Sequence, residues 1–431
     1  MTLRNNYLKW FFCFTVLLLP LLNFKVGDFR FDYQSYKFGF VVLIILLVIK
    51  IKFNRTLLNI FVLLCSFSIL SYCYNYYQIQ QNILLEKSVL IHSSAHMAEQ
   101  LLLHLFFIAL IVAIVSTKIR SSLLRVAFKT YIVSLVSISL ISIFLLFLEM
   151  IGLNLIGNSY SLGTYKLRGL LGEPKQFSAA MLSGFVLLMI TKKVGISFFD
   201  TFTTKSFLLL FLFSALASFS SSLIVSLCLF LLLFYFVNGR FQRILFLMML
   251  LIVCLIGVAE LSKNCESMDK MYQKTTIGND KYTILRKISS FGAVVSFIPK
   301  DGAVIVDAIC RPKNYILGQG PGGFYREFME QKLSNFDSLL KIKLFMSMYL
   351  KPLSVTQAPS TYQVRLFSDY GLIGVLLFLL LLATSEKILY DGSNKYYSIV
   401  MFFVFFMSIQ YFMFSIMMYF LALKSRPLPG E

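Results

Sequence analysis

The chain has 431 residues, of which 58% are hydrophobic and 14% are charged, and its mean hydropathy is +0.78. This composition excludes an ordinary soluble globular protein, and repeated apolar runs near the roughly 20 residues that cross a bilayer indicate membrane helices. Because a backbone in hydrocarbon must satisfy its own hydrogen bonds, we expect an all-α polytopic membrane protein. An outer-membrane barrel would instead show short segments of alternating hydropathy.

The formal net charge of +20 raises nucleic acid as a candidate partner. However, Lys and Arg lie mainly in short loops and in one long polar insert, and they do not form a surface interleaved with aromatic residues. We therefore expect the partners to be membrane lipids and an anionic lipid-linked ligand, and no nucleic acid.

The apolar runs predict about eleven membrane helices, with a range of ten to twelve because the last run is long enough for one tilted helix or two short ones. The first run follows Arg4 and Lys9 and lacks a small-residue cleavage site, so we expect a retained helix rather than a signal peptide. The predicted spans cover residues 10–24, 38–53, 57–75, 97–117, 127–153, 176–191, 206–219, 221–237, 241–261, 366–384 and 396–421.

The distribution of Lys and Arg between alternate loops predicts the orientation. With a cytoplasmic N-terminus, the inner loops hold sixteen basic residues and the short outer loops hold seven, so the positive-inside rule favours this topology. We expect three regions: residues 1–261 with nine helices and an outer loop at 154–175, a large extracytoplasmic loop at 262–364 with surface helices, and the last helices at 365–431. Cys265 and Cys310 in the large loop are expected to be free thiols, with a disulfide as the alternative in an oxidising compartment.

A glycine-rich segment lies near the middle of the large loop, at residues 317–324. Glycines such as Gly318, Gly320 and Gly322 let backbone N–H groups approach an anion closely, and the nearby Arg311 supplies a bidentate fork. The pattern is neither a Walker loop nor a dinucleotide fingerprint. A tight turn between surface helices is the alternative interpretation.

Two further stretches place complementary charges at the ends of predicted spans. In the outer loop, Arg168 and Glu173 precede Pro174, which suits the first turn of the next helix; a capped loop with a surface ion pair is the alternative. At the end of the insert, Arg365 and Asp369 have the i,i+4 spacing of a helical ion pair. An ionisable pair at the mouth of a span is a functional candidate.

These stretches, in this order, resemble the bacterial O-antigen polymerase (Wzy-type) family within the O-antigen polymerase and ligase superfamily. The resemblance covers roughly residues 160–380. It rests on Arg-Gly-Leu-Leu-Gly-Glu-Pro at 168–174, a Ser-rich hairpin at 218–222, Leu-Gly-Gln-Gly-Pro-Gly-Gly-Phe at 317–324 and Asp-Tyr-Gly-Leu-Ile-Gly at 369–374.

The resemblance implies a GT-C-like glycosyltransferase that uses no metal or other cofactor. Such enzymes transfer a growing glycan from undecaprenyl diphosphate to a new lipid-linked repeat unit at the outer face of the cytoplasmic membrane. The resemblance thus implies a role in polysaccharide biosynthesis, either of the O-antigen of lipopolysaccharide or of a capsule. The expected partner is an undecaprenyl-diphosphate-linked oligosaccharide, with a chain-length regulator as a further candidate.

The resemblance also suggests site residues. Family members are described with an Arg and a Gly eleven residues later; Arg311 and Gly322 have this spacing, whereas Ala179 stands at that distance from Arg168. We expect Arg168, Arg286 and Arg311 to stabilise the charge that grows on the departing diphosphate, and Glu173 to take the acceptor proton. The expected substrate-binding residues are Gly318, Gly320, Gly322, Tyr362, Arg365 and Asp369.

Histidine helps to choose within the superfamily. Ligases are expected to carry a His near the end of the large loop, but residues 359–362 read Pro-Ser-Thr-Tyr, and His92, His96 and His104 all lie upstream. This favours a polymerase over a polysaccharide ligase that uses a different base. His92 and His96 have a metal-binding spacing, but a polar helix end explains it and we expect no metal. The non-enzymatic alternative, a flippase or transporter of lipid-linked sugars, would be expected to show charges in several spans and two comparable halves.

Overall fold

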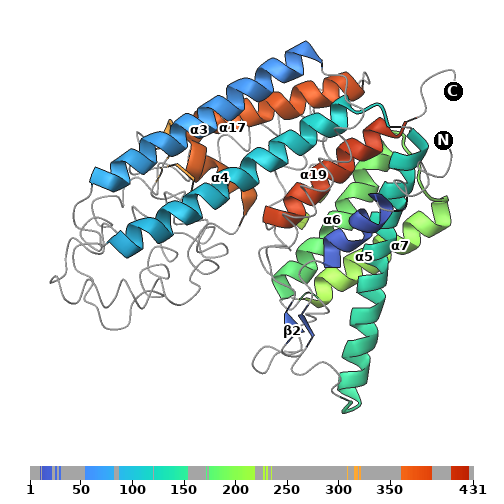
Figure 1. Cartoon of the computed structure of the whole chain (residues 1–431). Helices are drawn as coiled ribbons and strands as arrows, with labels where there is room; N and C mark the ends of the chain where they lie inside the picture. Colours follow the sequence, from blue (N-terminus) through green and yellow to red (C-terminus); the bar gives the residue numbers. More distant parts are fainter. Residues whose placement is uncertain are drawn as a thin grey trace. The chain divides into compact units, whose positions relative to one another are not determined.

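Helices account for nearly all the regular structure in the computed structural model (Figure 1). The only strands among the described residues, β1 (Lys25–Val26) and β2 (Phe29–Arg30), have two residues each and pair in antiparallel orientation. The described part of the chain is therefore helical, as the composition predicts. The structure describes residues 10, 12–21, 25–26, 29–30, 54–81, 87–119, 121–153, 171, 174–218, 227–228, 230–231, 234, 308, 315–318, 320–321, 361–390 and 409–426.

Four described helices are long and apolar enough to cross a membrane. The chain thus has the helices of an α-helical membrane protein. Their candidate spans coincide with the predicted spans at 57–75, 97–117, 127–153 and 366–384. They lie in α3 (Arg55–Gln81), α4 (Lys87–Ser116), α5 (Ser121–Met150) and α17 (Tyr362–Leu389).

The total of about eleven spans stays a prediction. The predicted runs at 38–53 and 241–261, and most of 221–237, lie outside the described residues. Within 10–24, residues 12–18 are helical and lead into η1 (Leu19–Leu21). The runs at 176–191 and 206–219 correspond to helices, of which the second, α7, is shorter than a full span. In the run at 396–421, the described residues 409–421 are helical, and residues 396–408 lie outside the described residues. These helices are α6 (Pro174–Lys193), α7 (Thr201–Ala217) and α19 (Ile409–Lys424).

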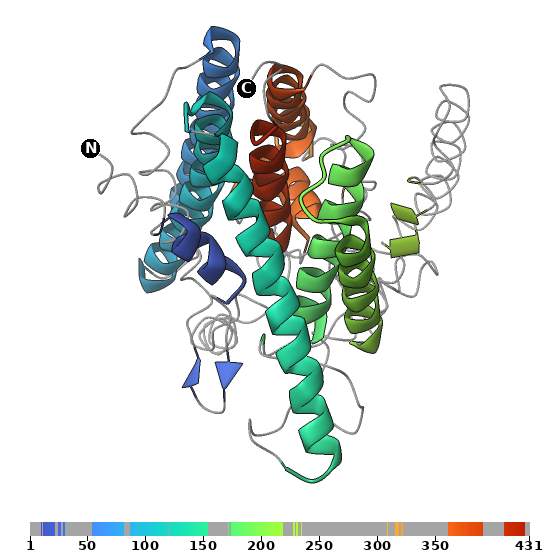
Figure 2. The same cartoon turned by 90° about the vertical axis from the view of Figure 1, so that its right-hand side faces the viewer.

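The chain forms two compact units, and the first contains residues 1–61, 105–230 and 380–431. In this unit α19 packs against α5 and α6, and α6 packs against α7 (Figure 2). Hydroxyl groups join the helices: Ser139 of α5 lies 2.6 Å from Ser214 of α7, and Tyr131 lies 3.3 Å from Ser183 of α6. Interhelical hydrogen bonds of this kind supplement van der Waals packing where lipid removes the hydrophobic driving force.

A buried carboxylate also belongs to the first unit. Glu386, in the last turns of α17, is fully buried and accepts a hydrogen bond of 2.6 Å from the Tyr419 hydroxyl of α19. A buried acidic group needs such donors, because an unsatisfied carboxylate in an apolar interior is costly.

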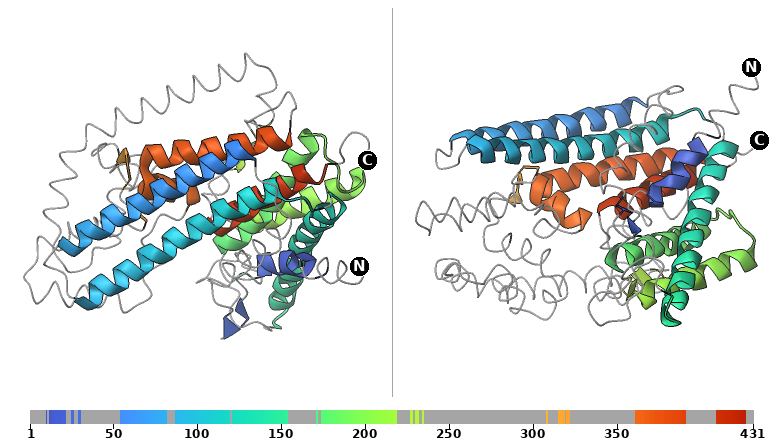
Figure 3. Two further views of the ribbon diagram at one scale, coloured as in Figure 1. Left: turned by 45° about the horizontal axis from the view of Figure 1, so that its top comes forward. Right: turned by 60° about the horizontal axis from the view of Figure 1, so that its bottom comes forward.

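The second unit contains residues 62–104 and 231–379. Residues 62–81 of α3 and 87–104 of α4 run side by side there (Figure 3). The N-terminal part of α17 belongs to the same unit and approaches α3 closely: a Cβ added at Gly374 would lie 3.3 Å from the ring of Phe67. The absence of a side chain at Gly374 allows this close approach between the two helices.

The start of α7 offers a test of helix capping and its pH dependence. The Asp200 side chain accepts a hydrogen bond from the Thr203 backbone N–H, and the Thr203 hydroxyl also donates to it. These hydrogen bonds favour the charged carboxylate and lower the pKa of Asp200.

Because the folded pKa is lower than the unfolded one, this contribution to stability is present above the unfolded pKa and is lost as pH falls through the folded pKa. Asp200→Ala should lower the melting temperature of the purified protein at neutral pH. The difference from wild type should be constant above the unfolded pKa of aspartate, about 4, and should shrink as pH falls below it. Asp200→Asn keeps a capping oxygen and serves as the control, and an unchanged Asp200→Ala melting temperature would contradict the assignment.

Candidate functional site

The backbone of α17 is broken at Gly371, inside the candidate span. Its φ of 65° and ψ of −168° are not helical and divide the element into segments 362–370 and 372–389. This region of backbone space is essentially restricted to glycine. The second segment alone is about 27 Å long, close to the thickness of the hydrocarbon core. A break here leaves carbonyls before it and N–H groups after it without helical partners.

The glycine-rich turn at residues 315–321 supplies partners on both sides of this break. The Gly320 N–H donates to the Asp369 carbonyl at 2.8 Å, and the Ile373 N–H donates to the Ile316 carbonyl at 3.2 Å. Within an apolar span each unsatisfied backbone group would cost several kcal/mol, in the range of about 2–7 kcal/mol. The turn therefore substitutes for hydrogen bonds that a continuous helix would make internally.

The docking is close enough to require glycine on both partners. A Cβ at Gly318 would collide with the backbone of Asp369 and Gly371, and a Cβ at Gly371 would collide with the backbone of Gly318. A Cβ at Gly320 would collide with the Asn75 side chain of α3. In this structure the turn thus approaches protein backbone. The Gly320 N–H donates to the Asp369 carbonyl of α17, whereas the sequence interpretation assigned it to an anion.

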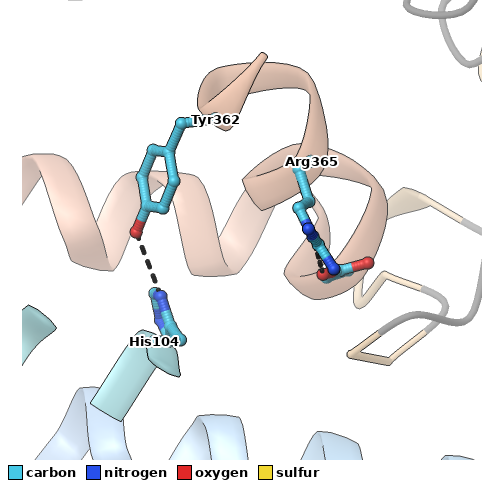
Figure 4. A network of polar contacts seen from close by, with 4 residues as sticks. His104, Tyr362 and Arg365 are labelled. Carbon is cyan, nitrogen blue, oxygen red and sulfur yellow. Dashed lines mark hydrogen bonds and ion pairs between the residues drawn. The ribbon is translucent and has the colours of Figure 1, made fainter. Parts of the chain in front are cut away.

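Arg365 and Asp369 form the ion pair that their spacing predicts. The Arg365 Nε lies 3.5 Å from the Asp369 Oδ2 (Figure 4), and the two side chains are 14% and 6% exposed. Taking charges out of water is costly, so each charge of a buried pair must be compensated by the opposite charge of its partner. The pair carries no net charge, so it does not favour a charged ligand in this region.

His104 of α4 meets the first segment of α17 in the same unit. Its Nδ1 lies 3.1 Å from the Tyr362 hydroxyl (Figure 4), and its ring stacks on Tyr370 with centroids 4.4 Å apart. Phe378 lies 6.2 Å from the His104 ring and 5.7 Å from the Tyr362 ring. We call His104, Tyr362, Tyr370 and Phe378 the aromatic cluster.

Two polar atoms of the aromatic cluster have no hydrogen-bond partner in the described part of the chain. They are the His104 Nε2 and the Tyr370 hydroxyl, and both side chains are at least 96% buried. Leaving a buried donor or acceptor unsatisfied costs about 1–3 kcal/mol, and native structures keep few such atoms. The cluster therefore has unused hydrogen-bonding capacity at a buried position.

The structure brings together five of the predicted site residues around the break in α17: Gly318, Gly320, Tyr362, Arg365 and Asp369. The sequence interpretation missed His104, because it treated the histidines only as upstream residues. An ionisable residue inside an apolar run was the signal that pointed to it. The remaining predicted site residues lie outside the described residues; they are Arg168, Glu173, Arg286, Arg311 and Gly322.

The other predictions concern cysteines, histidines, a metal site and the start of α6, and the structure describes only some of these residues. Cys265 and Cys310 lie outside it, so their pairing stays open. His92 and His96 lie on α4, but their side chains are not described. Among the described residues, no group of three His, Cys, Asp or Glu side chains is placed to hold a metal ion. Pro174 is the first residue of α6, the position expected from its fixed φ.

Buried ionisable and polar groups within apolar helices mark a functional site by default. Here they gather where a glycine-rich turn from the insert meets a broken span, so this region is the candidate site. Comparison with known proteins adds no family assignment: no protein-family model, no curated protein and no solved structure matches the chain.

Proposed function

We propose that the chain is a polysaccharide polymerase of the cytoplasmic membrane. It transfers a growing O-antigen or capsule glycan from undecaprenyl diphosphate to a lipid-linked repeat unit at the outer face. The resemblance of the ordered motifs supports this proposal. Its main structural support is a contact between two of these motifs: the turn at 315–321 docks on the segment that holds Arg365 and Asp369.

The chemistry divides between two sets of residues. In the transfer, the bond between the anomeric carbon and the diphosphate oxygen breaks, the acceptor oxygen forms the new glycosidic bond, and the acceptor hydroxyl loses its proton. The departing diphosphate needs uncompensated positive charge, which we assign to Arg168, Arg286 and Arg311. Glu173 is the proposed base for the acceptor proton.

The residues at the break in α17 suit a different task. Because Arg365 is compensated by Asp369, this pair is a poor counter-charge for a diphosphate. Aromatic faces and hydroxyl groups beside it suit a sugar, in keeping with the substrate-binding role expected for Tyr362 and Asp369. We therefore place sugar contacts here and diphosphate contacts on the arginines of the loops.

A flippase or transporter of lipid-linked sugars is the second candidate. The break at Gly371 favours it, because discontinuous helices form substrate sites in many transporters. Such proteins also tend to have inverted or parallel repeats, and no internal repeat is evident in this sequence. No feature of the described residues favours a ligase.

Deletion of the gene and separation of the cell's glycans distinguish the three activities. Loss of a polymerase should remove the long-chain ladder and leave one repeat unit attached to the final acceptor. Loss of that single unit as well would overturn the polymerase assignment. In that case, repeat units retained at the inner face would indicate a flippase, and polymers retained on undecaprenyl diphosphate would indicate a ligase.

The diphosphate contacts are tested by Arg311→Ala and Arg168→Ala. Each should lower the rate of chain growth by about 100-fold to 1,000-fold, as for loss of a group that stabilises transition-state charge, without lowering the protein level. Arg311→Lys keeps the charge but loses the fork, and should recover only part of the rate. Arg125→Ala is the matched control, because Arg125 donates to the Ser197 carbonyl at 2.7 Å in a predicted cytoplasmic loop. Normal ladders in both alanine variants would reject the assignment.

A further inference from the structure

The aromatic cluster differs from the other buried polar groups in the hydrogen-bonding capacity that it leaves unused. A neutral imidazole has one N–H donor and one bare nitrogen acceptor. With Nδ1 engaged by Tyr362, the Nε2 of His104 is left as a donor or as an acceptor, depending on the tautomer. The Tyr370 hydroxyl likewise keeps both its donor and its acceptor capacity.

Packing does not account for these two groups. Buried serine hydroxyls can hydrogen-bond to the carbonyl four residues earlier, as Ser68 does to Leu64, so serine tolerates burial in a helix. The His104 ring and the Tyr370 hydroxyl stand too far from their own backbones for this local solution. Phenylalanine would fill nearly the same volume at either position without a polar atom. Since the two rings stack on each other, the unused capacity is concentrated at one place.

We propose that the aromatic cluster is a binding subsite for a neutral sugar, whose hydroxyl groups hydrogen-bond to the His104 Nε2 and the Tyr370 hydroxyl. The identification of this sugar as part of the repeat unit rests on the proposed polymerase function. The aromatic rings supply apolar faces for the C–H faces of the sugar, and the few polar atoms fix its orientation.

Charge and ligand chemistry favour a neutral sugar over an ion. Among the described residues, the charges that act on Tyr362 and Tyr370 are those of Arg365 and Asp369, which compensate each other and leave no net charge to attract a phosphate or an ammonium group. A metal ion would need further ligands beside His104, and no group of three metal-ligating side chains occurs in the described part of the chain. A polyhydroxylated molecule satisfies both a donor and an acceptor, whichever tautomer His104 adopts.

The subsite is closed in this structure, since only 4% of His104 and 3% of Tyr370 are exposed. Access therefore requires movement of segment 362–370, which carries Tyr362 and Tyr370. The break at Gly371 provides a hinge for this movement, and the hydrogen bond from the Gly320 N–H to the Asp369 carbonyl ties the segment to the turn at 315–321 in the closed position. Binding would thus be coupled to the docking of the glycine-rich turn.

The first experiment observes the subsite directly. The full-length protein, labelled with ¹⁵N at histidine, is placed in lipid nanodiscs, and the His104 signals are assigned by their loss in His104→Phe. Glucose, galactose, rhamnose and N-acetylglucosamine are titrated separately, with sodium sulfate as the anion control. We expect at least one sugar to shift the Nε2 resonance saturably and sulfate to leave it unchanged. Tyr370→Phe should weaken that binding about fivefold, the loss expected for one hydrogen bond. A failure of all four sugars to shift the resonance would overturn the proposal.

The second experiment separates a binding role from a structural one. Tyr370→Phe removes a hydroxyl without a partner, so its melting temperature should equal or exceed that of wild type while chain growth falls. Tyr419→Phe is the matched control, because it removes a buried hydroxyl that donates to Glu386 and should lower the melting temperature. Full chain growth in Tyr370→Phe would overturn the proposal. If gene deletion leaves the glycan ladder intact, the polymerase function fails, whereas the titration still decides whether the subsite exists.

Discussion

Gly371→Ala is expected to undock the glycine-rich turn and to lower the free energy of unfolding by at least about 3 kcal/mol. The backbone conformation at Gly371 alone costs a non-glycine residue about 1–3 kcal/mol. The new Cβ would also collide with the carbonyls of Tyr315 and Ile316 and with the N–H group of Gly318, and backbone atoms cannot rotate away as a flexible side chain can. Relief of the collision would require loss of the hydrogen bonds across the break.

A matched control separates backbone strain from the collision. Gly195 has a similar positive φ of 81°, but no atom lies within 4 Å of a Cβ built there. Gly195→Ala should therefore cost only the strain, about 1–2 kcal/mol. Chemical unfolding of both variants in the same detergent measures the difference. Equal losses would mean that the turn does not dock on α17, and chain growth retained in Gly371→Ala would remove the docked turn from the functional site.

Features of the fold that depend on neighbouring residues were predictable from the sequence. The four candidate spans follow from local hydropathy, and the start of α6 at Pro174 follows from the fixed φ of proline. The pairing of Arg365 with Asp369 follows from the helical period, because residues four apart share one face. In each case the information lies within one or two helical turns.

Features that depend on distant residues were not predictable. The sequence does not indicate the break at Gly371, whose backbone conformation is matched to a turn about fifty residues earlier in the chain. His104 contacts Tyr362, which is 258 residues away. Neither hydropathy nor spacing encodes such a pairing, because both describe segments rather than the packing between them. The role of the arginines assigned to the diphosphate stays a prediction for the same reason, since it depends on which loops lie close together.

The charge pair at the break in α17 allows its structural and functional roles to be measured separately. Asp369→Leu leaves the Arg365 guanidinium largely buried without its counter-charge, and should lower the free energy of unfolding by about 3 kcal/mol. We choose the lower end of the range for buried pairs because Arg365 remains 14% exposed. The backbone carbonyl of residue 369 still accepts from Gly320 in this variant, so the docked turn itself is not removed.

The double variant Arg365→Met/Asp369→Leu removes both charges and should recover most of the lost stability, because an apolar pair of similar volume avoids the cost of desolvation. Unfolding free energies of the wild type, both single variants and the double variant form the cycle that measures the coupling. Additive losses would show that the two side chains do not interact. If the stable double variant also restores chain growth, the pair serves only to hold the fold. We expect chain growth to stay low, because Asp369 and Arg365 then no longer offer polar groups to the sugar beside the aromatic cluster.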